Sequence, residues 1–300
     1  MPKLSIPSIA RHATLVLLLC LTGTASALAG THPALWKAGN SHVTVYFFGT
    51  VHVMKKGVQW HFPALDKALH ASGTYYMETT QANPAMIRPL VMQYGFDPAH
   101  PLSSKIGKKE NALLKQAAKQ IGLPGGAAML EMMKPWMAAI TIATAPLVKA
   151  GFDPKLGVDK QLQARFKKAG KPVKGFETAK QQILFIATLP EAVQIKFLGK
   201  SLHDYAHANE ELKALMNDWL HGDVPALARI IVTQMKDSSP KVYQALIVNR
   251  NHTWAKQIAK LMKTSKGTFF VAVGAGHLVG PDRLQVQLAR LGIQVKRVDH

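Results

Sequence analysis

Five short stretches of this 300-residue chain have the apolar pattern of buried β-strands. The first, HVTVYFFGTVHV (residues 42–53), begins with apolar and polar residues in alternation and then becomes continuously apolar, which is typical of a central strand. The other four are GTYYMET (73–79), KPVKGFE (171–177), GTFFVAVGAG (267–276) and IQVKRV (293–298). The pattern therefore predicts a sheet of about five strands.

Helical spacing of apolar residues fills the segments between these strands. The clearest cases are FPALDKALHAS (62–72), DKQLQARFKKAG (159–170) and PDRLQVQLARLG (281–292). Strands separated by helices favour an α/β fold with a largely parallel sheet. We therefore expect a single α/β domain over residues 30–300, in which two longer helical regions, about 84–148 and 179–262, are insertions that form a cap or lobe. The uncharged stretch at residues 135–148 is too short to span a membrane and predicts a buried helix.

Residues 1–29 have the pattern of a secretory signal peptide. Lys3 and Arg11 give a basic start, ATLVLLLCL forms a short apolar core, and the small-residue triplets ASA and ALA offer two cleavage sites. We therefore expect a periplasmic or secreted protein. Cys20, the only cysteine of the chain, lies inside this segment. The mature protein would thus have no disulfide, thiol nucleophile or cysteine-ligated metal.

The chain is strongly basic, with 37 Lys and Arg residues against 17 Asp and Glu residues. Outside the cytosol such a charge suits an anionic polysaccharide or an anionic membrane surface as partner, although an evenly solvated basic surface is the more ordinary explanation. Basic runs with interleaved aromatic residues, which are typical of nucleic-acid binding, do not occur, so we expect no nucleic-acid partner.

Chemically active residues follow four of the five predicted strands. GTVH (49–52) and GAGH (274–277) are both Gly-x-x-His motifs at the end of an apolar run, and they supply His52 and His277. Glu78 and Glu177 end two further strands. Since ligands of open α/β sheets bind at the carboxyl ends of the strands, these four side chains are expected to converge there.

Two imidazoles and one or two carboxylates form a nitrogen and oxygen ligand set that suits Zn²⁺, Mn²⁺, Fe²⁺ or Co²⁺. A bound divalent ion would supply hydroxide near neutral pH, and a second carboxylate would act as general base or protonate a leaving group. No dinucleotide fingerprint, G-x-S-x-G, H-E-x-x-H or phosphate loop occurs in the sequence. The motifs therefore favour a metal-dependent reaction over nucleotide or serine-hydrolase chemistry.

Each residue also has an ordinary structural interpretation. A single histidine at a strand end is more often a hydrogen-bonded structural residue than a ligand, and a glutamate there is often solvated. Asp159 is as well suited to cap a helix as to join a site. His203 and His207 are expected to share one helix face as an i, i+4 pair, without an evident third ligand.

The ordered motifs ALWKAGN, VYFFGTVHV, YYMET, GVDKQL, GKPVKGFET, NRNHTWAKQI and FFVAVGAGHLVG resemble the TraB/GumN family, the bacterial relatives of the Tiki metalloproteases. The resemblance extends from Ala34 to Val298 and implies an α/β fold like that of the erythromycin-esterase and ChaN group. It also implies a metal-dependent peptidase activity, because Tiki proteins are described as Mn²⁺- or Co²⁺-dependent peptidases.

The resemblance assigns roles by motif. His52, His277 and Glu78 match the motif positions implied for metal binding, and Glu78, Glu177 and Arg250 are the candidate catalytic residues. Gln182 and Asn251 match further motif positions. The family often has an acid before the matching arginine, whereas this chain has Asn249, which weakens any role implied for Arg250. Physically, Arg250 would hold a carboxylate in place or bind an anionic substrate group, and a surface salt bridge is its ordinary alternative.

The leading functional hypothesis is a periplasmic metal-dependent hydrolase, a peptidase by resemblance, that uses Mn, Co or Zn on a peptide or cell-envelope substrate. Two alternatives stay open: a haem- or iron-binding protein on a ChaN-like scaffold, and a non-catalytic accessory of exopolysaccharide or cell-envelope production. Replacing either histidine with alanine is expected to remove the metal and leave the fold largely intact, because a ligand facing a cleft supports little core packing.

Overall fold

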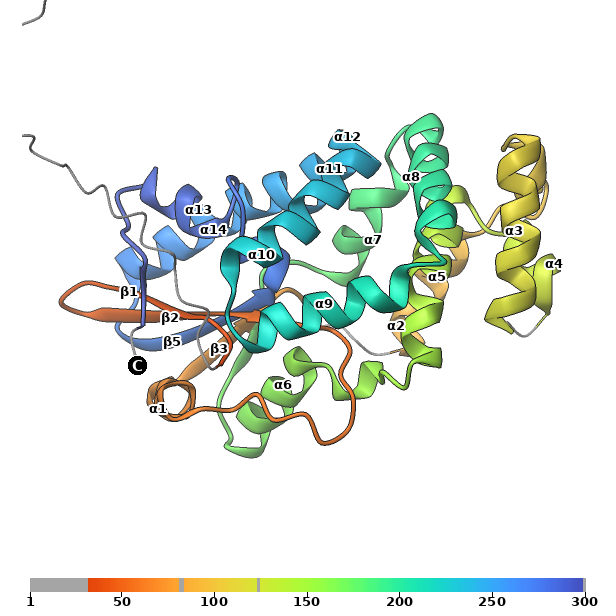
Figure 1. Ribbon diagram of the computed structural model, residues 1–300. Coiled ribbons are helices and arrows are strands. Elements are labelled where there is room, and N and C mark those ends of the chain that lie inside the picture. Colours follow the sequence, from red (N-terminus) through yellow and green to blue (C-terminus); the bar gives the residue numbers. More distant parts are fainter. Residues whose placement is uncertain (1–31, 81–83, 123–124, 299–300) are drawn as a thin grey trace, which may run out of the picture.

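The computed structural model describes residues 32–80, 84–122 and 125–298, so the expected signal peptide lies outside the described residues. A six-stranded sheet of order β4-β3-β5-β2-β1-β6 forms the centre of the fold (Figure 1). Its strands are β1 (Leu35–Gly39), β2 (Val43–Thr50), β3 (Thr74–Met77), β4 (Val173–Gly175), β5 (Gly267–Gly274) and β6 (Lys296–Arg297). Strands β4, β3, β5 and β2 are parallel, and β1 is antiparallel to both β2 and β6. The predicted α/β class with a largely parallel sheet is confirmed.

Helices cover both faces of the sheet. The helices are α1 (Pro63–Ala71), α2 (Pro84–Gly95), α3 (Lys108–Ile121), α4 (Gly126–Glu131), α5 (Pro135–Lys149), α6 (Val158–Lys168), α7 (Ala179–Ala187), α8 (Glu191–Asp204), α9 (Ala208–Leu220), α10 (Val224–Ala228), α11 (Gln234–Ser238), α12 (Pro240–Tyr243), α13 (Asn249–Thr264) and α14 (Leu284–Ala289). Two π-helical segments, η3 (Arg229–Thr233) and η4 (Gln244–Val248), and a 3₁₀ turn, η5 (Ala275–Leu278), lie between them. In Figure 1, α1 and α6 lie on one side of the sheet, and α13 and α14 lie on the other.

The two faces follow from the alternation of side chains along each strand. On β2, Phe48 packs in the cluster that contains residues of α1 and α6, whereas its neighbour Phe47 packs with residues of α13 and α14. On β5, Phe270 and Val271 divide between the same two clusters. All four are fully buried, and burial of such a side chain contributes about 1.5–3 kcal/mol. Because both faces are covered, the strands are continuously apolar near their carboxyl ends.

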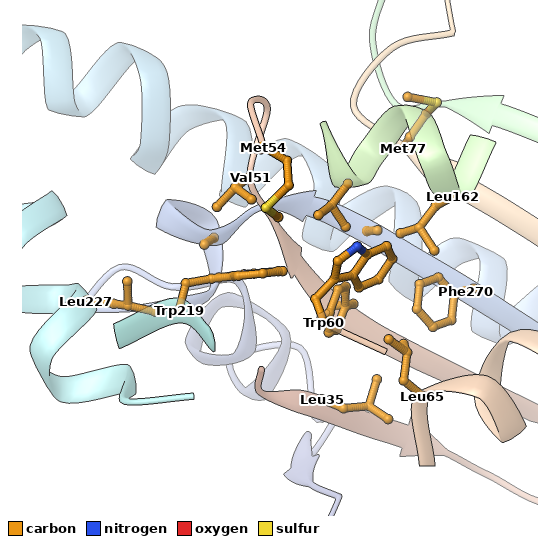
Figure 2. Close-up of a cluster of buried hydrophobic side chains, with 14 of the residues drawn as sticks. Leu35, Val51, Met54, Trp60, Leu65, Met77, Leu162, Trp219, Leu227 and Phe270 are labelled. Carbon is orange, nitrogen blue, oxygen red and sulfur yellow. The ribbon is translucent and has the colours of Figure 1, made fainter. Parts of the chain in front are cut away.

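Aromatic side chains join the helical part of the chain to the sheet. Figure 2 shows Trp60 and Trp219 among the buried side chains around Phe270. Trp219 comes from α9, and its indole Nε1 donates to the carbonyl oxygen of Gly49 at 2.8 Å. This bond fixes α9 against the end of β2, at the first residue of the first Gly-x-x-His motif.

A separate core lies away from the sheet, in the lobe built by α3, α4, α5 and α8. Buried residues of these helices include Leu114, Leu130, Ile142 and Leu198. The uncharged stretch at 135–148 falls within α5, which buries part of its surface in this core, as the sequence predicts. Among the described residues, the helices are all too short or too polar to cross a bilayer.

Three local expectations differ from the structure. Strand β1 is absent from the sequence prediction because its five residues are short and only partly apolar; pairing with β2 and β6 decides its conformation. The predicted strands at 171–177 and 293–298 are present but reduced to the cores of β4 and β6. The prediction that His203 and His207 share one helix face is wrong. His203 lies in α8, whereas His207 precedes α9 as its N-cap residue, so the two do not share a helix.

Candidate functional site

The strand order brings the four predicted strand-end residues to one edge of the sheet. Thr50, the last residue of β2, pairs in register with Gly274, the last residue of β5, so both Gly-x-x-His loops leave the sheet side by side. On the other side of β5, β3 pairs with β4, and the backbone N–H of Glu177 donates to the carbonyl oxygen of Glu78 at 3.0 Å.

Arg250 occupies the centre of this edge. It lies at the start of α13, directly after the π-helical segment η4, and its side chain is 9% exposed. Its guanidinium NH2 donates to Oε2 of Glu78 at 2.5 Å and to Oε1 of Glu177. Its Nε donates to both oxygens of Glu177 at 3.1 and 3.3 Å, and its NH1 donates to the carbonyl oxygen of Leu246 at 3.2 Å. The guanidinium therefore joins the two glutamates, and the missing acid at Asn249 does not leave it without a carboxylate partner.

Glu177 is held by three different donors. Besides Arg250, the indole Nε1 of Trp254 donates to its Oε2 at 3.2 Å, and Nε2 of Gln182 donates to its Oε1 at 3.0 Å. Burial raises the pKa of Glu177, and the hydrogen bonds from Arg250 and Gln182 limit that rise. With both oxygens engaged, Glu177 is arranged to position Arg250.

Glu78 is also fixed at both oxygens. Its Oε1 accepts from the backbone N–H of Gly274 at 2.8 Å, and its Oε2 accepts from Arg250 and, at 3.3 Å, from Nε2 of Gln182. Burial alone would raise the pKa of this carboxyl group, but the charge of Arg250 nearby lowers it to about 2. Glu78 is therefore a fully ionised carboxylate in a defined orientation.

His277 is buried and neutral. Its side chain is 3% exposed, and burial lowers its pKa to about 3. The amide Nδ2 of Asn251 donates to the carbonyl oxygens of His277 and Asp282, so Oδ1 of Asn251 is the acceptor for Nδ1–H of His277 at 2.7 Å. This geometry leaves a lone pair on Nε2, which lies 3.1 Å from NH1 of Arg250 and 3.8 Å from Oε1 of Glu78.

His52 lies on the open side of the site. Its side chain is 62% exposed, and its Nδ1 lies 3.5 Å from Oδ2 of Asp159, in the first turn of α6. Loss of solvation lowers the pKa of His52, but the hydrogen bond to Asp159 and the charge of Glu78 outweigh it and raise the value to about 8. The N-cap of α6 is Gly157, so Asp159 does not cap this helix; its side chain belongs to the site.

Gly274 provides the space in which these groups meet. A Cβ atom on this residue would lie 3.2 Å from Oε1 of Glu78, 3.4 Å from Nε2 of His52 and 3.8 Å from Cδ2 of His277. The glycine of the second motif therefore lets backbone approach three functional side chains closely. Beside it lies a cavity of about 270 Å³, lined by Thr50, His52, Met77, Glu78, Thr79, Asp159, Gln182 and Ala272.

The structure thus brings together His52, His277, Glu78, Glu177 and Arg250, the candidate site residues taken from the sequence, while their chemical roles stay predictions. The sequence prediction omits Thr50 and Trp254. A signal for Trp254 was available, because it follows Arg250 by four residues and so shares its helix face.

The donor chemistry of the site fits a divalent metal ion. His52 Nε2 and Glu78 Oε1 face the space left by Gly274, and His277 Nε2 lies 3.8 Å from the same Glu78 oxygen. Both histidines turn Nδ1 towards an oxygen of Asp159 or Asn251, which is the arrangement that orients metal-ligating imidazoles. Ligation by His277 requires Arg250 NH1 to withdraw from Nε2. Within the described residues, no group of three or more His, Asp or Glu side chains already has the geometry of a metal site.

The sheet has a parallel core, and its edge carries paired Gly-x-x-His motifs and two glutamates joined by an arginine. These features define a class of α/β proteins with a polar site at the sheet edge. A sequence model of the TraB/PrgY/gumN family matches residues 34–297, and the chain belongs to this family. The expected family is therefore confirmed.

The chain is similar to the uncharacterized protein YbaP of Escherichia coli strain K12 and to that of Shigella flexneri. Each is 27% identical over 187 residues, which cover 62% of this chain and 67% of the relative. No solved structure matches the chain.

Proposed function

We propose that the protein is a divalent-metal-dependent hydrolase, with a peptide as substrate, that acts outside the cytosol. The observation that carries the proposal is the orientation of the two motif histidines. Each has Nδ1 turned to an oxygen acceptor. His52 Nε2 and an ionised glutamate, Glu78, face the space beside Gly274, and His277 Nε2 lies 3.8 Å from Oε1 of Glu78. Resemblance to the Tiki metalloproteases supports the choice of a peptide as substrate.

His52, His277 and Glu78 would hold the ion, which is Mn²⁺, Co²⁺ or Zn²⁺. When bound, such an ion would polarise a carbonyl group and lower the pKa of a water molecule. The chain's own residues prepare the site for it. Arg250, Gln182 and the N–H of Gly274 keep Glu78 ionised and fixed in direction.

The two glutamates have unequal access to a substrate. Glu78 lines the cavity, whereas Glu177 is not among its lining residues and has both oxygens occupied by donors. Glu78 is therefore the carboxylate that can ligate the ion or move a proton, and Glu177 acts through Arg250. We therefore propose that Glu177 is a positioning residue and not the catalytic residue that the sequence predicted.

Metal analysis of untagged protein tests the proposal directly. We expect about one equivalent of Mn, Co or Zn per chain, retained through gel filtration and removed in His52→Ala. The exposed His61→Ala variant, outside the site, is the matched control and should keep the metal. Protein that binds none of these ions, or a His52→Ala variant with full occupancy, would contradict the proposal. A Soret absorption band would instead support the haem-binding alternative.

Export is tested separately. We expect the mature protein in the periplasm with an amino terminus near Leu28 or Gly30, just after the apolar core of residues 13–21. Mass spectrometry of protein from fractionated cells measures this terminus. An intact Met1 in the membrane fraction would mean that the segment is an uncleaved anchor.

A further inference from the structure

The outer face of α13 carries a row of lysines. Lys256, Lys260 and Lys263 are exposed, and at 3.6 residues per turn they lie within about 60° of one another around the helix axis. Along that axis they extend over about 10 Å. Lys266 is also exposed and continues the row just beyond the end of the helix. These four residues are called the lysine row below.

The lysine row lacks an acidic partner in the part of the chain that the structure describes. Residues 240–281 contain six basic residues and no acidic residue. The neighbouring elements add none: α14 has no acidic residue, and neither has the turn between β1 and β2, from which Asn40 donates to the carbonyl oxygen of Met262. The ion pairs found among the described residues involve none of the four lysines.

Helix stability and packing do not explain the row. Lys256 and Lys260 are four residues apart and Lys260 and Lys263 are three apart, so their like charges are neighbours and destabilise the helix. The packing of α13 uses its other face, where Trp254 and Ile258 are buried against the sheet. A partner with several negative charges would relieve the repulsion, and the charge of the row is complementary to such a polyanion.

The shape and the neighbours of the row indicate which polyanion fits. The row is one residue wide, so it matches a linear chain of charges. A helix that binds in a membrane interface uses apolar side chains beside the basic ones, and single-stranded nucleic acid is bound by exposed aromatic rings. Apart from the lysines, the exposed residues of α13 are polar and include no aromatic ring of that kind: His252, Thr253, Gln257 and Thr264. Their oxygen and nitrogen atoms suit the hydroxyl groups of sugars.

We propose that the lysine row is a docking site for a linear acidic polysaccharide, whose carboxylate groups pair with the lysines. Arg250, which serves the candidate functional site, lies at the start of α13, and the row extends from there towards the other end of the helix. The lysines do not line the cavity beside Gly274. Docking would therefore hold the protein on the polymer and leave the candidate site accessible. The proposal does not depend on the proposed function.

Binding to polygalacturonate, a linear polymer of carboxylated sugars, tests the proposal. Its methyl ester and dextran are the uncharged controls, and a chelator in the buffer prevents metal ions from bridging the carboxylates. In biolayer interferometry the protein should bind polygalacturonate with an affinity that falls as salt is added, and should bind the uncharged polymers roughly tenfold or more weakly. No binding of polygalacturonate, or equal affinity for its methyl ester, would overturn the proposal.

Two variants with the same net charge locate the site. The first replaces the lysine row: Lys256→Gln, Lys260→Gln, Lys263→Gln and Lys266→Gln. The matched control removes four exposed lysines of α3: Lys108→Gln, Lys109→Gln, Lys115→Gln and Lys119→Gln. The first variant should bind polygalacturonate roughly tenfold or more weakly, because four modest ion pairs are lost together, and the control about twofold or less.

Equal losses in these two variants would mean that binding reflects overall charge, and would overturn the proposal. Circular dichroism should show that both variants are folded, since exposed lysines contribute little to packing. The double variant Lys256→Gln with Lys260→Gln disturbs the helix less and should lose an intermediate part of the affinity. Unchanged affinity in the double variant would also contradict the proposed docking site.

Other polyanions distinguish the class of partner. Phosphatidylglycerol vesicles and single-stranded DNA should bind more weakly than polygalacturonate at the same salt concentration. If either binds more tightly and loses affinity only in the lysine-row variant, the surface serves that partner and the proposal fails. Metal content and hydrolysis of short peptides should be the same in the lysine-row variant as in the wild type. A failure of the hydrolase proposal therefore leaves the result of the binding test unaffected.

Discussion

Removal of Arg250 should destabilise the metal-free protein more than removal of an exposed ion pair does. The side chain is 9% exposed and serves Glu78, Glu177, the Leu246 carbonyl and His277. Arg250→Ala leaves two buried carboxylates without their cation, and breaking such a pair from one side costs about 3–5 kcal/mol. For a chain of this size that loss lowers Tm by roughly 6–20 °C.

The matched control is Arg165→Ala. Arg165 pairs with Asp66 at 2.6 Å, but the two side chains are 42% and 45% exposed. Removing an exposed pair costs about 0–1 kcal/mol. Arg250→Lys, which keeps the charge but loses the planar set of donors, should fall between the two. Chemical denaturation followed by circular dichroism measures all three variants. Equal losses for Arg250→Ala and Arg165→Ala would refute the reasoning.

The loss of stability caused by Arg250→Ala should also depend on pH. The folded-state pKa of Glu78 is about 2, below its usual 4.5, so in the wild type its ionised form contributes stability above about pH 4.5. That contribution disappears as pH falls towards 2. The difference between wild type and Arg250→Ala should therefore be largest near pH 7 and should shrink at pH 3–4. A difference that does not change with pH would mean that lost packing, and not unpaired charge, dominates.

Four further variants test the site. His52→Ala should lose metal without a change in Tm, whereas His277→Ala should lose metal and stability together. His277 is expected to affect stability because it is buried and its ring lies 4.4 Å from that of Trp254, so its removal takes away packing. Glu78→Gln should lower turnover by roughly a hundredfold or more if this residue transfers a proton, and should lose the metal if it is a ligand; unchanged turnover and metal content would exclude both roles. Since both Glu78 oxygens accept hydrogen bonds, the new amide group meets a donor, so its Tm must be measured alongside. Trp254→Phe keeps an aromatic ring at this position but removes the donor to Glu177 and should cost about 1–3 kcal/mol or more in urea unfolding; an unchanged stability would show that this bond is dispensable.

The sequence by itself determined the local structure that delivers the site. Continuous apolar runs specify strands covered on both faces, and a polar residue that follows such a run must lie at the strand end. His52, His277, Glu78 and Glu177 could therefore be found without coordinates. Five-residue β1 could not, because its conformation depends on the strands that pair with it.

Only the tertiary structure decided how these residues work together. The contacts of Arg250 with Glu78 and Glu177 join positions 172 and 73 residues apart, a separation that no local periodicity encodes. Their meeting depends on β3 lying between β4 and β5 and on α13 packing against the sheet. The same packing makes His277 neutral and leaves His52 exposed, although their motifs look alike. Periodicity records which side of an element is buried, whereas pKa, tautomer and access to a cavity depend on which neighbours the assembled layers supply.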